Sequence, residues 1–168
     1  RMTDGVGEWY DSEYVSSTSD PEPVIVQNLV DWLKKLRPRV VTYNGRSTDI
    51  PLLAMRAMHY GIEMGFWFNQ SDKWNNYTAR YCPDYHFDVL DWLSQYGATS
   101  RLKIREVMAL LRLPDKIYAG GQVLTMWLAG AIEHIREYCE LDSFNTFLVY
   151  VHVQHLRGAI TQAGKEAS

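Results

Sequence analysis

The sequence predicts an α/β fold, because one short apolar strand lies between two segments with helical periodicity. Before Pro38, apolar side chains recur three to four positions apart, at Ile25, Leu29, Trp32 and Leu36. This is the spacing of one face of an α-helix. VVTYN, residues 40–44, is short and rich in β-branched and aromatic residues, as buried strands are. A second helical segment follows, and helix, strand and helix in succession are typical of α/β proteins.

The size and composition of the chain suit one globular domain. It has 168 residues, of which 46% are hydrophobic and 13% aromatic, enough to form a core. We therefore expect residues 1–168 to form a single domain. The net charge of −3 excludes a generally basic surface. Any contact with nucleic acid then has to be local, or has to rely on metal ions that offset the phosphate charge.

Cysteine content and hydropathy bear on the location of the protein. Its two cysteines, Cys82 and Cys139, form no Cys-x-x-Cys pair, which predicts a reduced, cytoplasmic protein without structural zinc. No apolar run reaches the length that spans a bilayer. Residues 1–14 lack the pattern of a signal peptide. We therefore expect no membrane partner.

The elements expected at the N-terminus are a strand and a helix. GEWYDSEYV, residues 7–15, favours a strand or one arm of a hairpin. Asp20 suits the N-cap of the first helix, Pro21 its first position and Glu22 its first turn. This helix is expected to end before Pro38, because proline cannot continue it.

Beyond the strand at 40–44, the chain alternates between helices and loops. Pro51 suits the first turn of a helix that Gly61 ends. Residues 65–85 are aromatic, polar and irregular, and long loops of this kind are uncommon unless they are functional. Helices are expected at 87–97, at 101–113 and from about 131 to 156, with a glycine-containing loop at 116–123.

The residues that suggest chemistry are two carboxylates and a phenol. Asp49 lies between the strand and the helix that follows it, in VVTYNGRSTDI; it either caps this helix or holds a metal ion against a phosphate. Tyr138 and Asp142, in YCELD, lie four residues apart on one helix face. Oxygen ligands of this type suit Mg²⁺, with waters and substrate phosphates completing its shell. Each pattern alone is more often structural than catalytic.

Several segments together resemble a known family. YNGRSTDIPLLAMRA, WNNYTARYCPDYHFDVLDWLSQYG, IREVMALLRLP and IREYCELDSFNTFLVYVHVQHLRG occur in this order. They resemble the predicted 3′–5′ exonucleases related to the proofreading domain of family B DNA polymerases, in the tyrosine-bearing subclass of the DEDD superfamily. The resemblance covers roughly residues 20–158 and implies a ribonuclease H-like fold, a mixed sheet flanked by helices.

The resemblance also implies a site. Asn44 and Asp49 match the second motif of the family, and Tyr138 and Asp142 match the third. It implies a domain that uses two divalent cations, Mg²⁺ or Mn²⁺. Its implied substrate is DNA, bound as a single strand or at a 3′ end. Asp142 would bind metal directly, Asp49 largely through water, and Tyr138 would position the attacking water.

Two departures from the family matter. Thr48 precedes Asp49 where the family usually has an aromatic residue. The first motif, Asp-x-Glu at the end of an apolar strand, is absent; residues 11–13 have the spacing but follow no buried run. The chain therefore resembles such a domain without its N-terminal strand. Three explanations are open: the given sequence starts after this strand, a second polypeptide supplies the strand, or the protein has lost catalysis and kept the fold.

Other residues suggest contacts with substrate. Trp74 and Tyr77 alternate with cationic and amide side chains in residues 65–85, as in proteins that stack single-stranded bases on aromatic rings. The alternative is that these rings are core residues. Arg46, just after the strand, could contact a phosphate. Asp88 and Asp91 suggest a solvated helix face or an N-cap.

These observations predict a metal-dependent 3′–5′ exonuclease domain that hydrolyses terminal phosphodiesters of DNA. The alternative is an inactive ribonuclease H-like module that binds nucleic acid or takes part in assembly.

Overall fold

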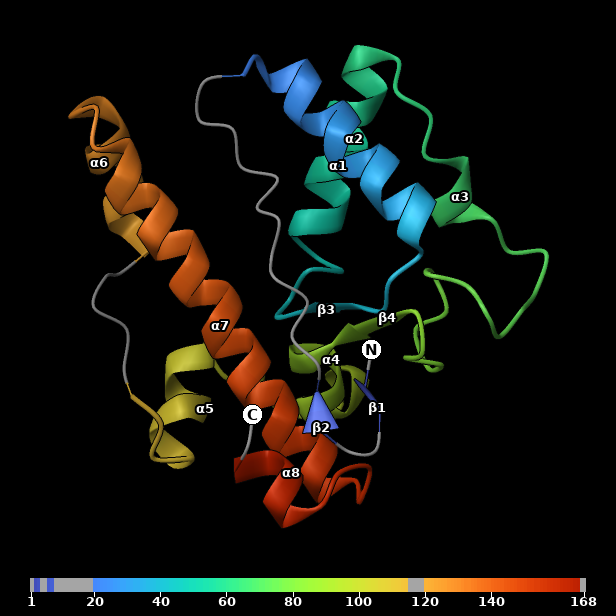
Figure 1. Cartoon of the computed structure of the whole chain (residues 1–168), viewed down its shortest axis with the longest axis vertical. Helices are drawn as coiled ribbons and strands as arrows, with labels where there is room; N and C mark the ends of the chain where they lie inside the picture. The colour runs from blue at the N-terminus through green and yellow to red at the C-terminus, as the bar shows by residue number, and fades with distance from the viewer. Residues whose placement is uncertain (1, 4–5, 8–19, 115–119, 167–168) are drawn as a thin grey trace. The chain divides into compact units, whose positions relative to one another are not determined.

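The computed structural model describes residues 2–3, 6–7, 20–114 and 120–166 (Figure 1). The chain divides into two compact units. One comprises residues 14–99, and the other comprises residues 1–13 with residues 100–168. Each is described by itself below, and the number of independently folding domains stays a prediction.

A parallel pair of strands forms the centre of the unit at 14–99. Strand β3 (Val40–Thr42) pairs with β4 (His86–Asp88), with Val40 opposite His86 and Thr42 opposite Asp88. Helix α2 (Asp49–Tyr60) and the short α3 (Gly65–Phe68) lie between these strands in the sequence. The unit is therefore of the strand–helix–strand type, and the carboxyl ends of both strands lie at the same edge. The expected α/β class is confirmed, with a small parallel sheet in a mostly helical chain.

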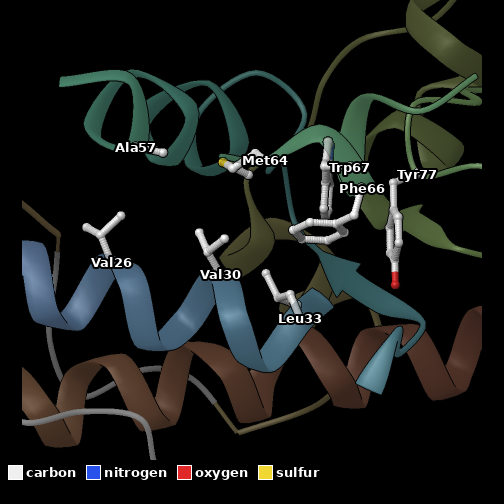
Figure 2. Close-up of a cluster of buried hydrophobic side chains, with 8 residues drawn as sticks. All are labelled: Val26, Val30, Leu33, Ala57, Met64, Phe66, Trp67 and Tyr77. Carbon is white, nitrogen blue, oxygen red and sulfur yellow. The ribbon is translucent and has the colours of Figure 1, made fainter. Parts of the chain in front are cut away.

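The core of this unit lies between α1 (Glu22–Leu36), α2 and the segment that follows them. Figure 2 shows its eight buried side chains, which are Val26, Val30, Leu33, Ala57, Met64, Phe66, Trp67 and Tyr77. The rings of Trp67 and Tyr77 stack with their centroids 4.4 Å apart. The Tyr77 hydroxyl donates a hydrogen bond to the Pro38 carbonyl (2.8 Å), which satisfies its one polar group inside the core. Part of the loop predicted at 65–85 is thus core.

Polar contacts join α1 to α2 at the surface. The Arg56 guanidinium pairs with both carboxylate oxygens of Glu22, and the Tyr60 hydroxyl lies 2.8 Å from Glu22 Oε2. These groups lower the pKa of Glu22, with the hydrogen bond from Arg56 as the largest cause. The contacts fix which faces of the two helices meet.

The second unit is built on one long helix, α7 (Ile132–Leu156), the long orange ribbon of Figure 1. Helices α5 (Ile104–Leu110), α6 (Val123–Leu128) and α8 (Gln162–Glu166) each contact α7. A 3-10 turn, η2 (Gly120–Gln122), precedes α6, and β1 (Met2–Thr3) pairs antiparallel with β2 (Val6–Gly7). The long helix predicted at about 131–156 is confirmed.

Three expected boundaries are wrong. The predicted helix at 87–97 starts too early, because residues 87 and 88 belong to strand β4. It reduces to α4 (Val89–Leu93) and a 3-10 turn, η1 (Gln95–Gly97). Three buried residues are too few to display the alternation of a strand. Helix α1 begins at Glu22 with the extended Pro21 as its N-cap, one position later than expected from Asp20. The helix expected at 101–113 covers only Ile104–Leu110.

The end of α2 agrees with the sequence. Gly61 ends α2 in the left-handed conformation (φ 69°), as predicted. Residues 8–15 of the predicted N-terminal strand and residues 116–119 of the predicted loop lie outside the described residues. Among the described helices, none combines the length and apolar character needed to cross a bilayer. The compartment of the protein stays a prediction.

Candidate functional site

The turn after β3 depends on Asn44 and Gly45. Asn44 has φ 70°, in the left-handed region that asparagine and glycine tolerate best. A Cβ atom on Gly45 would lie 2.5 Å from Cβ of Thr42, too close for any side chain. The Asn-Gly pair therefore turns the chain sharply at the carboxyl end of the strand. In open α/β sheets, ligands bind at such strand ends.

Asp49 is the first residue of α2, and its side chain is exposed. Thr48 occupies the N-cap position, and its side chain forms no capping hydrogen bond. The helix-capping interpretation of Asp49 is therefore wrong for this conformation. The Thr48 hydroxyl lies 2.8 Å from the Asn44 carbonyl and 3.2 Å from Oδ2 of Asp49, and its single proton serves one of them at a time. Asp49 thus presents an accessible carboxylate beside the strand end.

Asp88, at the carboxyl end of β4, binds the main chain of the turn at residues 44–46 through hydrogen bonds. Its side chain is only 5% exposed. Oδ1 accepts a hydrogen bond from the Asn44 amide and Oδ2 one from the Arg46 amide, both at 2.9 Å. Oδ1 also accepts from the Asp91 amide at 3.2 Å, which makes Asp88 the N-cap of α4. The N-cap interpretation of Asp88 is thus confirmed, and a solvated helix face is excluded.

Asp91 has a different partner. Its carboxylate, 6% exposed, forms a two-point pair with the Arg80 guanidinium, with Nε 2.7 Å from Oδ2. This hydrogen bond raises the pKa of Arg80. Two buried carboxylates three residues apart are therefore each compensated separately, Asp88 by main-chain amides and Asp91 by a cation.

Arg46 extends into the protein. Its guanidinium lies 2.9 Å from the His86 carbonyl and 3.2 to 3.5 Å from the carbonyls of residues 77–79. Burial lowers its pKa, and the nearby Asp88 carboxylate opposes this effect. The two terminal nitrogens of Arg46 are thus engaged by main-chain carbonyls. A direct contact between Arg46 and a phosphate stays a prediction.

The two aromatic residues expected to bind substrate differ in placement. The Trp74 side chain is 57% exposed, and Nζ of Lys73 lies 4.7 Å from the centre of its ring. Tyr77 is 1% exposed and belongs to the core. A base could stack on Trp74 as it stands, whereas stacking on Tyr77 would require that ring to leave the core.

Tyr138 and Asp142 lie one turn apart on α7, as the sequence predicts, and both side chains are partly buried. Burial raises the pKa of Tyr138, so its hydroxyl stays protonated at neutral pH and can both donate and accept a hydrogen bond. These residues belong to the unit at 100–168, and Asp49 belongs to the other unit. The expected separation of roughly 8 Å between the Asp49 and Asp142 carboxylates, the range of a shared metal cluster, stays a prediction.

The donor set bears on the expected metal. Among the described residues, no group of three or more His, Cys, Asp or Glu side chains converges. Asp49 and Asp142 offer hard oxygen donors, which fit Mg²⁺ or Mn²⁺ and not a thiolate-preferring ion. Mg²⁺ is commonly held by one or two carboxylates together with substrate phosphates, so the residues present fit a weakly held ion.

The sequence indicated an N-cap at Asp88 but not its contact with the turn after β3. Asp88 begins the DVLDWL segment and lies three residues before Asp91, which marks a helix N-cap. Its hydrogen bonds to residues 44 and 46 join segments more than 40 residues apart. No local pattern reports such a contact.

Comparisons with known proteins give one matching family and two similar polymerase subunits. A family model described as "Predicted 3'-5' exonuclease related to the exonuclease domain of PolB" matches residues 9–168. The DNA polymerase epsilon catalytic subunit from Emericella nidulans is 24% identical over 155 residues, 87% of this chain. The same polymerase subunit from Aspergillus fumigatus matches equally over 155 residues. The chain spans about 7% of the length of these curated relatives. No solved structure gives a significant match.

Proposed function

The chain belongs to the family of predicted 3′–5′ exonucleases related to the exonuclease domain of PolB, and from this we propose that it hydrolyses terminal phosphodiesters of single-stranded DNA. The observation that supports the proposal best is the exposed carboxylate of Asp49, the first residue of α2, just after the turn that follows β3. A ribonuclease H-like arrangement, in which the small parallel sheet is the centre of a larger mixed sheet, is part of the proposal.

We assign the residues as follows. The carboxylates of Asp49 and Asp142 hold divalent cations, Mg²⁺ or Mn²⁺. Bound cations of this kind neutralise phosphate charge and lower the pKa of water. The protonated Tyr138 hydroxyl orients the attacking water through a hydrogen bond.

The loop around Trp74 is the proposed contact for the single strand. The exposed indole offers a stacking surface, and the neighbouring Lys73 ammonium offers a cation for the backbone. Tyr77 then contributes indirectly to strand binding, because its buried ring stacks on Trp67 and anchors the end of this loop. Asn44 acts through its main chain, which shapes the turn before Asp49.

Two carboxylates are too few to fix two ions about 4 Å apart. We therefore propose that an Asp-x-Glu strand from a preceding segment or a second polypeptide completes the site. Among the described residues, β3 and β4 form a sheet of two strands. This supports the proposal, because a sheet of two strands is marginal by itself and accepts a further strand at an edge.

The test is release of mononucleotides from a 3′-labelled single strand in Mg²⁺ or Mn²⁺. The isolated 168-residue chain should release little. A polypeptide that carries the Asp-x-Glu strand, added in cis or as a separate chain, should restore release, and Asp142→Ala should abolish it again. Robust release by the isolated chain, lost on Asp142→Ala, would show that this chain contains a further ligand; Asp11 and Glu13 would be examined first.

The second candidate function is a non-catalytic module that binds nucleic acid or takes part in assembly. The exposed Trp74 ring with Lys73 beside it favours this function, because such a surface can bind a single strand without a metal ion. Binding of a single-stranded oligonucleotide that is independent of divalent ions, with no release in any reconstitution, would decide for this function.

A further inference from the structure

The hydrogen bonds of Asp88 point to a role beyond helix capping. We propose that Asp88 is the positioning residue of the Asp49 site: its buried carboxylate clamps the turn at residues 44–46 and so fixes the direction of the Asp49 side chain. The proposal rests on the proposed function, in which Asp49 holds a divalent cation.

The first step is the clamp itself. Each carboxylate oxygen of Asp88 takes a different amide of the turn, Oδ1 that of Asn44 and Oδ2 that of Arg46. A buried carboxylate accepts such bonds strongly, because each one is charge-assisted. Since Asp88 lies on β4 and the turn follows β3, the clamp also joins the ends of the two parallel strands.

The second step leads from the turn to Asp49. The Asn44 carbonyl accepts hydrogen bonds from the amides of Ser47 and Thr48, both at 3.1 Å. The Gly45 carbonyl accepts one from the Ile50 amide at 2.9 Å. Asp49 lies between two residues that are held in this way. Its orientation therefore depends on where the carbonyls of the clamped turn point.

The third step is the chemistry at position 88. Two amides approach two different oxygens, so the position needs two acceptors. An asparagine offers one acceptor and one NH₂ donor, so it would present a donor to one of the two N–H groups. A serine still caps α4 but is too short to span both amides. The two substitutions therefore separate capping from clamping.

Arg46 supports the turn from its other side. Its amide donates to Asp88, and its guanidinium donates to carbonyls of residues 77–79 and of His86. The turn is thus tied to the loop at 77–79 as well as to β4. A turn held at both ends can keep an exposed carboxylate in one direction.

The test uses the full 168-residue chain with Asp88→Ser, and Asp91→Asn as the matched control. Asp91 lies on the same short helix and is almost as buried, but its carboxylate pairs with Arg80. Amide hydrogen exchange at Thr48 and Ile50 should become at least tenfold faster in Asp88→Ser, relative to the Val30 amide in α1, and should be unchanged in Asp91→Asn. If Asp88→Ser does not fold, Asp88→Asn serves instead, with the same comparison.

A second readout separates positioning from plain stability. The Mn²⁺ concentration that half-broadens the Asp49 amide signal should rise about tenfold in Asp88→Ser, the size expected for losing a charge-assisted hydrogen bond, and should stay constant in Asp91→Asn. Equal relative exchange at Thr48 and Ile50 in wild type and Asp88→Ser would overturn the proposal. A wild-type chain with no Mn²⁺ effect at Asp49 would contradict the proposed function instead, because the exchange measurement needs no metal.

Discussion

His86 should make the protein unstable in mild acid. Its side chain is 1% exposed, its Nε2 lies 2.9 Å from Oγ1 of Thr42, and its ring meets the Trp67 ring edge-on. Burial lowers the pKa of His86 to about 4, and the Arg46 guanidinium adds to this effect. The carboxylates of Asp88 and Asp91 act in the opposite direction.

The sign follows from the two protonation equilibria. The folded state binds the imidazole proton only near pH 4, whereas the unfolded chain binds it near pH 6.5. The unfolded state therefore carries more protons between these values, and stability falls as pH is lowered through this window. A difference of about 2.5 pKa units amounts to about 3 kcal/mol in full, and to about 2 kcal/mol at pH 5.

The assay is urea denaturation of the wild type and of His86→Gln at a series of pH values between 7.5 and 4.5. Glutamine keeps a polar group near Thr42 but does not titrate. The variant should be less stable at pH 7.5, and the difference between the two proteins should shrink by about 2 kcal/mol on going to pH 5. Other titrating groups cancel in this difference, because both proteins contain them.

Parallel stability curves for the two proteins over this range would refute the reasoning. An imidazole pKa near 6.5 in the folded protein, measured by NMR, would refute it as well. Either result would mean that the ring reaches water or finds an anionic partner when it is protonated.

The remaining predictions concern the loop and the turn. Trp74→Ala should change stability by no more than about 0.5 kcal/mol but weaken oligonucleotide binding, measured by fluorescence anisotropy, because its ring is exposed. Tyr77→Ala should cost about 3 to 5 kcal/mol, measured by urea denaturation, because its ring is buried; a marginal cost together with weaker binding would favour direct stacking instead. Gly45→Ala should cost about 1 to 3 kcal/mol by the same assay, because its Cβ would meet Thr42 at 2.5 Å; an unchanged midpoint would show that the turn relaxes freely.

The parts of the fold that the sequence predicted are those whose cause is local. Helices α1 and α2 have periodic apolar faces, and Gly61 supplies the left-handed residue that ends α2. Strand β4 was missed because three residues show no period, and only its partner β3 defines it as a strand. The loop at 65–85 looked exposed because its composition is mixed, yet Tyr77 from this loop completes a core begun by α1.

The same distinction applies to the site. The Asn-Gly turn and the Tyr-x-x-x-Asp spacing are local, and both have the expected backbone setting. The partners of the Arg46 guanidinium and the amides of the turn that Asp88 holds lie 31 to 44 residues away in the sequence. The sequence therefore suggested a phosphate contact for Arg46 and no site for Asp88. In the structure, the Arg46 guanidinium contacts main-chain carbonyls, and the Asp88 carboxylate binds amides of the turn before Asp49.

The placement of Asp49 and Asp142 in different compact units makes their relation testable by a double-mutant cycle. The cycle compares Asp49→Asn, Asp142→Asn and the double variant. Their effects on Mn²⁺ affinity, measured by titration with oligonucleotide present, should be far from additive: if both carboxylates hold one ion cluster, either substitution removes most of the binding and the second adds little. Fully additive losses of affinity would mean two independent sites, and the roughly 8 Å separation expected for a shared cluster would then be wrong.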